Sequence, residues 1–263
     1  MTSVKLETLH EDSLRGLKQL KLLAMRHLSA EHEHFSLAFA KSQHVGFLCR
    51  IDQGSNRLTE LSAAVLRHLP LLEQLLLGGK FDKDGWGRTI VKGNRITELG
   101  AIFGHNEQLQ VIDFGQNRLQ KIDPATFAGL KKLRWLRLRS NWLTTIPAGA
   151  FQGLGQLQTL NLRGNKLTTI PAGTFQGLEQ LQTLNLKSNR LTTIPAGTFQ
   201  GLGQLQTLSL GYNKLTTIPA GTFQGLEQLQ SLNLDDNLWN SSSVCINSTS
   251  LPLLNGLSGV SFC

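Results

Sequence analysis

Leucines recur along the chain at a constant spacing. A pattern close to Leu-x-x-Leu-x-Leu-x-x-Asn-x-Leu-x-x-Ile-Pro begins at positions 109, 133, 157, 181, 205 and 229, so the step is always 24. Within it, stretches such as LRL (136–138) and LNL (160–162) alternate leucine with a polar residue. This alternation predicts a short strand with one buried face. Each repeat is therefore expected to contribute one strand and a segment that returns the chain to the start of the next.

Two other residue types keep the same step. The asparagines are Asn117, Asn141, Asn165, Asn189, Asn213 and Asn237, and the phenylalanines are Phe127, Phe151, Phe175, Phe199 and Phe223. An asparagine that ends a strand can hydrogen-bond to the backbone of its own bend and of the neighbouring turn. We therefore expect the asparagines to form a structural ladder and the phenylalanines to fill the core between the convex segments.

Each unit can bury its apolar edge only against its neighbours, which predicts a stacked solenoid. The 24-residue pattern, with the second half IPAGTFQGL, resembles the leucine-rich-repeat family. It is similar to the typical subclass found in Toll-like receptors, small proteoglycans and variable lymphocyte receptors. The resemblance implies an α/β-type, curved horseshoe with a concave parallel β-sheet and a mostly irregular convex side. It also implies non-enzymatic recognition of proteins through the concave face, as in a receptor ectodomain or an immune-type recognition fragment.

The repeats differ in regularity along the chain. Residues 109–237 hold the regular repeats, and residues 1–108 show the same frame in degenerate form, beginning in mid-repeat. Extra residues occur near 28–47 and near 79–93; the second is either a loop inserted into one repeat or a very short additional repeat. Residues 238–263 leave the frame and are expected to cap the last apolar edge. All of these segments are predicted to form one continuous solenoid domain.

The regular repeats also alternate, because 133–180 and 181–228 read as two copies of a two-repeat unit. This pattern indicates tandem duplication. The copies differ mainly at the outward-facing strand positions. Either these positions alone tolerate change, or the face has been diversified for binding.

Basic and aromatic residues collect at the outward positions. The predicted contact set is Trp135, Arg137, Arg139, Trp142, Arg163, Lys166, Lys187, Arg190 and Tyr212. Exposed Trp, Tyr and Arg are the side chains that most often anchor interfaces. The partner predicted from this set is a protein with an acidic surface, although long cationic side chains can also be merely solvated. The C-terminal end of the same face is acidic, at Asp235 and Asp236.

The overall charge agrees with an anionic partner. The 263 residues carry a formal net charge of +8, which favours acidic ligands. A nucleic acid is not expected, because no recognisable nucleic-acid-binding module is present. No run of about 18 apolar residues occurs, so no transmembrane segment is expected. Two alternative functions remain open: a bacterial effector or intracellular adaptor with the same binding mode, and a structural scaffold without a specific ligand.

Cofactor and metal chemistry are not expected. The DKDG stretch (82–85) lacks the further acidic ligands of a calcium loop, and an exposed charged helix explains the His and Glu residues of 26–35 better than a metal site does. No catalytic constellation is evident. A disulfide between Cys245 and Cys263 would tie the C-terminus, but with Cys49 as a third thiol, three reduced cysteines are the alternative.

The compartment stays open at this stage. The repeat subclass and the glycosylation triplets NSS (240–242) and NST (247–249) favour an extracellular protein. The first residues lack an apolar signal core, which favours a cytoplasmic protein or a delivered effector.

Overall fold

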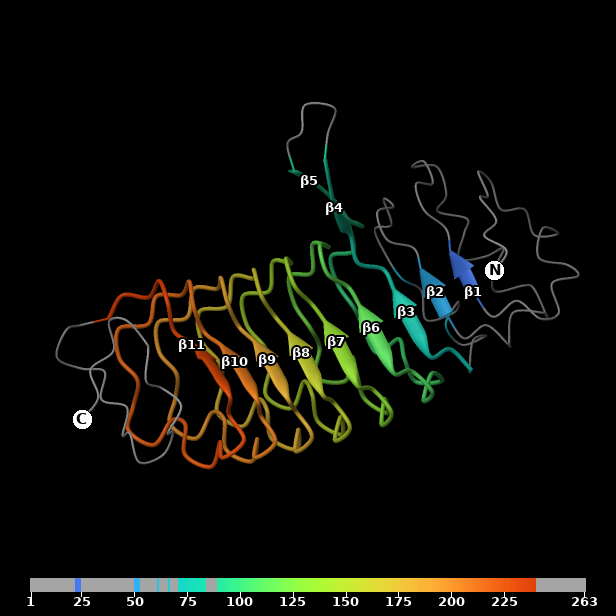
Figure 1. Cartoon of the computed structure of the whole chain (residues 1–263). Helices are drawn as coiled ribbons and strands as arrows, with labels where there is room; N and C mark the ends of the chain where they lie inside the picture. The colour runs from blue at the N-terminus through green and yellow to red at the C-terminus, as the bar shows by residue number, and fades with distance from the viewer. Residues whose placement is uncertain are drawn as a thin grey trace, which may run out of the picture.

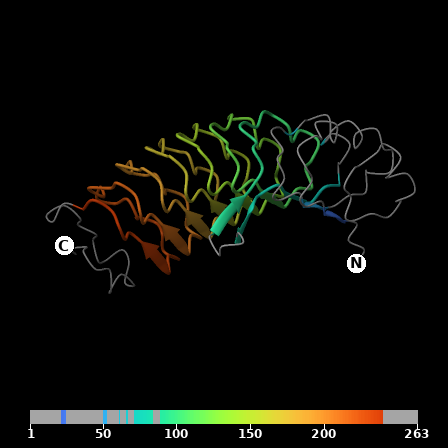
Figure 2. The same cartoon turned by 90° about the horizontal axis from the view of Figure 1, so that it is seen from above.

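The computed structural model describes residues 22–24, 50–52, 61, 66, 71–83 and 89–239. Within these residues, nine three-residue strands form one parallel sheet, in the order β1-β2-β3-β6-β7-β8-β9-β10-β11 (Figure 1). Their bounds are β1 Leu22–Ala24, β2 Arg50–Asp52, β3 Gln74–Leu76, β6 Val111–Asp113, β7 Trp135–Arg137, β8 Thr159–Asn161, β9 Thr183–Asn185, β10 Thr207–Ser209 and β11 Ser231–Asn233. The strands line one side of a curved array, and the irregular connecting segments lie behind them (Figure 2). The predicted leucine-rich-repeat solenoid is confirmed.

The register of the sheet follows the 24-residue step. From β6 to β11 each strand residue pairs with the residue 24 positions later, as Leu136 does with Leu160. The middle residue of each of these strands is buried, while the flanking residues, such as Trp135 and Arg137, are partly exposed. The strands begin one residue before the LRL and LNL stretches that predicted them. Leu138 follows its strand, yet it is fully buried and its N–H still donates to the Asn161 carbonyl at 2.8 Å.

Each asparagine after a strand connects two repeats. Asn141 accepts a hydrogen bond from the Leu119 N–H at 3.0 Å and donates to the Phe114 and Leu138 carbonyls at 2.9 and 3.0 Å. The same arrangement recurs at Asn165, Asn189, Asn213 and Asn237. Backbone groups that the bend would otherwise leave buried and unpaired are thereby satisfied, at about 1–3 kcal/mol for each group.

The phenylalanines form a continuous stack through the core. Ring centroids of successive residues from Phe103 to Phe223 are 6.1–6.4 Å apart, with interplanar angles of 7–19°. The stack extends one ring further upstream than the predicted set, because Phe103 joins it although its repeat is irregular. Offset stacking of this kind adds to the burial energy of the rings.

The extra residues near 79–93 form a hairpin within one repeat. Strands β4 (Lys80–Lys83) and β5 (Thr89–Lys92) pair antiparallel with each other, while β3 pairs directly with β6. The Asn94 side chain donates to the Leu77 carbonyl at 2.8 Å, the bond that the other ladder asparagines make to a residue three positions earlier. The hairpin therefore separates β3 from the asparagine that follows it, and it projects beyond the ends of the strands (Figure 1).

Several sequence predictions lie outside the described residues. These are the segment 28–47 with its His and Glu residues, the cap beyond 239, the glycosylation triplets and the three cysteines. Among the described residues, no helix has the length and apolar character needed to cross a membrane. The same part of the chain contains no group of three or more His, Cys, Asp or Glu side chains positioned for a metal ion.

Candidate protein-binding surface

The predicted contact residues other than Tyr212 lie on β7 or in two rows that cross the sheet. Trp135 and Arg137 lie on β7 itself and point outward. The first row, the end row, lies two residues beyond each strand and contains Arg139, Arg163 and Lys187. The second row, the flank row, directly follows the ladder asparagines and contains Arg118, Trp142, Lys166, Arg190 and Lys214. Neighbouring strands are about 4.8 Å apart, so each row brings charges from successive repeats close together.

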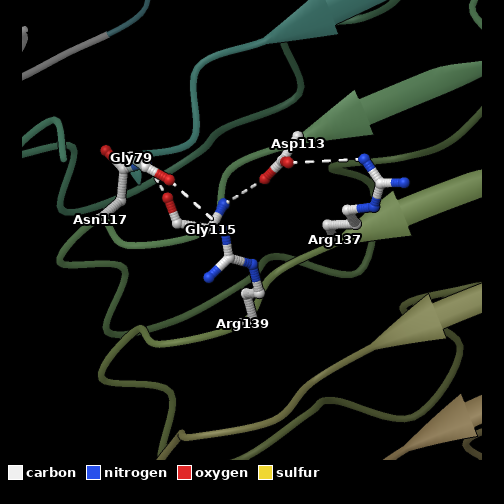
Figure 3. A network of polar contacts seen from close by, with 6 residues as sticks. All are labelled: Gly79, Asp113, Gly115, Asn117, Arg137 and Arg139. Carbon is white, nitrogen blue, oxygen red and sulfur yellow. Dashed lines mark hydrogen bonds and ion pairs between the residues drawn. The ribbon is translucent and has the colours of Figure 1, made fainter. Parts of the chain in front are cut away.

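Arg137 is partly neutralised by an acid from the preceding repeat. Its Nη1 lies 3.6 Å from Oδ2 of Asp113, which is on β6 (Figure 3). The other carboxylate oxygen of Asp113 accepts the Gly115 N–H at 2.8 Å. Asp113 is thus fixed by its own backbone, and it holds the guanidinium of Arg137 over the sheet.

Arg139 lies against the base of the inserted hairpin. Its Nη2 donates to the Gly79 carbonyl at 3.4 Å, and the Gly79 N–H donates to the Gly115 carbonyl at 2.9 Å (Figure 3). A Cβ on Gly115 would lie 2.9 Å from Cγ of Arg139 and 3.0 Å from Oδ1 of Asp113. Glycine at this position therefore leaves the room that both charged side chains need.

Trp142 is exposed and held between two cations. Its relative exposure is 41%, yet Cζ of Arg118 lies 5.7 Å and Nζ of Lys166 4.8 Å from the ring centroid. The two cations come from the repeats on either side. Cation–π contacts of this kind contribute about 0.5–1 kcal/mol each at exposed sites. Arg118 lies outside the predicted contact set, although its place in the same column as Trp142 follows from the 24-residue step.

Tyr212 lies where the basic part of the surface ends. It is 51% exposed, and Nζ of Lys187 lies 4.6 Å from its ring centroid. A side-chain hydrogen bond with Asp236 raises the pKa of Tyr212, and the negative charges of Asp236 and Asp235 act in the same direction. The Tyr212 backbone has φ of 56°, in the left-handed region that non-glycine residues rarely adopt.

The left-handed conformation belongs to the repeat and is not peculiar to Tyr212. The residue before the asparagine adopts it in six successive repeats, at Gln116, Ser140, Gly164, Ser188, Tyr212 and Asp236. Gly164 alone among these six takes the conformation without a Cβ penalty. The turn therefore presents the side chain at this position in a fixed direction, whichever residue occupies it.

The other predicted residues differ in exposure. Arg163 and Arg190 are exposed, whereas Lys166 and Lys187 are partly buried by their neighbours. Beyond them the end row loses its positive charge: Gly211 is buried, and Asp235 is exposed and accepts from Nδ2 of Asn233 at 2.5 Å. The described surface is thus basic and aromatic over β7–β9 and acidic at β11.

A comparison with protein-family models identifies the repeat. The model described as leucine rich repeat matches residues 90–143, 135–191 and 179–238, which together span more than half of the chain. The chain belongs to the leucine-rich-repeat family. Leucine-rich-repeat proteins are generally recognition modules rather than enzymes, and their curved sheets provide extended concave binding surfaces. No match was found among curated protein sequences.

Solved structures share the fold of this leucine-rich-repeat chain. One is a chain of the octameric complex of Latrophilin 3, Unc5D and FLRT2, in which FLRT2 contributes the leucine-rich repeats. It is 22% identical, with a TM-score of 0.73 over 94% of this chain and 70% of that chain. Another is a chain of the Toll–Spatzle complex of Drosophila, 21% identical, with a TM-score of 0.66 over 95% of this chain. This protein spans only 37% of the length of that second chain. At these identities the likeness shows the fold.

Proposed function

We propose that this leucine-rich-repeat protein binds another protein through the outward face of β7–β9 together with the end and flank rows. The observation that carries the proposal is the cluster of Trp135, Arg137 and Trp142 on exposed or partly exposed positions that the repeat does not require. The equivalent residues 48 positions later are Thr183, Asn185 and Arg190, and the same strand geometry accommodates them. A stacking role alone therefore does not account for the cluster.

The arrangement suits recognition of an acidic protein surface. Trp142 and Tyr212 offer large apolar areas whose positions are fixed by neighbouring cations. Side chains that are already ordered lose less conformational entropy when a partner binds. The surrounding Arg and Lys residues would attract an acidic partner and orient it during the encounter. In this mechanism the aromatic residues provide most of the binding energy, and the cations provide rate and specificity.

The architectural relatives agree with a receptor-like role. FLRT2 and Toll each stand in a structure that also contains other proteins. On the basis of this likeness we propose receptor-type recognition for the present chain. The alternative is a bacterial effector or intracellular adaptor that binds its partner through the same surface. A scaffold without a ligand would leave the aromatic and basic cluster without a use.

The proposal is tested by reversing charge on exposed positions. Arg163→Glu combined with Arg190→Glu changes two side chains that form no ion pair within the described residues. Lys131→Glu serves as the matched control, because Lys131 is exposed in a turn outside the sheet and both rows. Each protein is immobilised and used to capture partners from source cells. Thermal melting, followed by circular dichroism, checks that each variant folds.

The expected result is that the wild type and the Lys131→Glu control retain the same partner, while the double reversal binds it at least about tenfold more weakly with unchanged melting. Trp142→Ala should weaken the same interaction. Partners that bind all the variants equally, or the absence of any partner, would overturn the proposal.

A further inference from the structure

The end row changes sign along the sheet. At the position two residues beyond each strand, β7, β8 and β9 carry Arg139, Arg163 and Lys187, β10 carries Gly211 and β11 carries Asp235. The in-register pairing of the strands makes these residues consecutive neighbours across the sheet. At about 4.8 Å for each strand, roughly 19 Å separates the first arginine from the aspartate.

The cationic and acidic side chains of the end row are separated from each other in the structure. Tyr212 stands between them, with Nζ of Lys187 4.6 Å from its ring centroid on the basic side and with Asp236, which raises the pKa of Tyr212, on the acidic side. Gly211 fills the intervening place without a side chain, because a Cβ there would collide with Oδ1 of Asn233. The basic and acidic parts of the row therefore do not neutralise each other, and both remain available to a ligand.

The described part of the structure provides no acidic partner for two cations of the row. Arg163 and Lys187 form no ion pair in the part of the chain that the structure describes. Arg139 is oriented by the Gly79 carbonyl, which fixes the end of the row nearest the inserted hairpin. Adjacent cations with an acidic group beyond a gap form an asymmetric pattern, and a complementary ligand would carry the opposite charges in the same order.

We propose that the end row binds a segment of mixed charge in the partner protein, with acidic side chains over β7–β9 and a basic side chain at Asp235 and Asp236. The proposal rests on the protein-binding function proposed above and adds the charge order of the bound segment. A fully extended stretch of about six residues spans the roughly 19 Å from Arg139 to Asp235. The gap at Gly211 corresponds to an uncharged residue in that stretch.

A uniform polyanion fits this pattern less well than a protein segment does. A nucleic acid strand that continued along the row would bring its phosphates to Asp235 and Asp236, which are exposed and repel them. Single-stranded nucleic acids also gain affinity by stacking bases on aromatic rings. The ring of Trp142 already has a cation from each neighbouring repeat. A polypeptide can carry both signs in the required order.

The test selects ligands without assuming a sequence. Displayed random dodecapeptides are selected against the full chain, and individual winners are measured by fluorescence anisotropy at low salt. Asp235→Lys reverses the charge at the acidic end. Glu227→Lys is the matched control, an exposed acid shortly before β11 that lies outside the sheet. Arg163→Glu with Lys187→Glu removes the basic part.

We expect the wild type to select peptides that join an acidic cluster to a Lys or Arg about six residues away, the extended length that matches the row. These peptides should bind Asp235→Lys about threefold to tenfold more weakly and Glu227→Lys equally well. Selected peptides that are acidic throughout, with no loss on Asp235→Lys, would overturn the charge order and leave the proposed function intact. No selected peptides, or peptides that bind equally to the Arg163 and Lys187 double variant, would overturn both.

Discussion

Replacing a ladder asparagine in the middle of the solenoid should be among the most destabilising single changes in the regular repeats. Asn165 accepts from the Leu143 N–H at 3.1 Å and donates to the Leu138 and Leu162 carbonyls at 3.0 and 2.9 Å. Asn165→Ala leaves the buried Leu143 N–H without its partner, while the Leu138 and Leu162 carbonyls each lose one bond and keep the one from Asn141 or Asn189. An unpaired buried donor costs about 1–3 kcal/mol and each lost bond about 0.5–1.5 kcal/mol, so we expect a loss of about 2–4 kcal/mol in the free energy of unfolding.

A matched asparagine in the same repeat provides the control. Asn161 is on the outward face of β8, and its Oδ1 accepts only the Arg163 N–H, at 3.1 Å, in an exposed position. Asn161→Ala should therefore cost less than about 1 kcal/mol, because water replaces the lost bond. Asn237 makes the bonds of Asn165 at the end of the ladder, where it is partly exposed. Because water can reach some of the freed groups there, we expect an intermediate cost of about 1–2 kcal/mol for Asn237→Ala.

Urea unfolding followed by far-ultraviolet circular dichroism measures all three variants. Stability in repeat proteins is close to a sum of intrinsic terms and nearest-neighbour interface terms, so a broken interface in the middle should also broaden the transition. Equal losses for Asn165→Ala and Asn161→Ala would refute the reasoning. The ladder would then be a consequence of the turn geometry and not a source of its stability.

Two further predictions concern the left-handed turn. Tyr212 is the one tyrosine of the chain, so absorbance at alkaline pH reports its titration alone. The hydrogen bond with Asp236 raises the pKa of Tyr212 above its ordinary value of 10.0. The folded state should therefore lose this stabilisation as the pH rises through the raised pKa, and Asp236→Asn should lower the midpoint of the titration. An unmoved midpoint would contradict the contact. Gly164→Ala should lower the free energy of unfolding, measured in urea, by about 1–2 kcal/mol, because φ at Gly164 is 70°. Ser188→Gly should change it by less, because the relief of backbone strain opposes the greater entropy of glycine in the unfolded chain. Similar losses for the two variants would argue against backbone strain at this position.

The repeat step predicted most of the architecture, for a physical reason. Each unit can bury its apolar edge only against a copy of itself, so the spacing of leucines fixes the register of the sheet. The outward position of Trp135 and Arg137 could be derived in the same way, by adding 24. The inserted hairpin could not, because the spacing from Leu72 to Leu109 fits a loop and a short repeat equally well. The bond from Asn94 to Leu77 places the extra residues within one repeat.

The finer features of the surface depend on contacts that no periodicity encodes. Arg139 donates to the Gly79 carbonyl, 60 positions earlier in the chain, because the irregular insertion that begins there places this carbonyl just beyond the end of β3. The clearance at Gly115 depends on the direction of the Arg139 side chain. The placement of Arg118 beside Trp142 depends on side-chain rotamers. A sequence column lists which residues can be neighbours, and the conformations decide which of them make contact.

The repeat register gives the protein an adjustable length. Every strand pairing and every ladder bond between residues 109 and 237 joins the same positions of adjacent units. Recombination between the near-identical units 133–180 and 181–228 would add or remove one whole two-repeat unit without creating a new junction. Such an event would lengthen or shorten the sheet by two strands, about 10 Å, and would change the distance between the basic and acidic parts of the surface. Proteins descended from one gene could thus bind ligands of different lengths with the same fold.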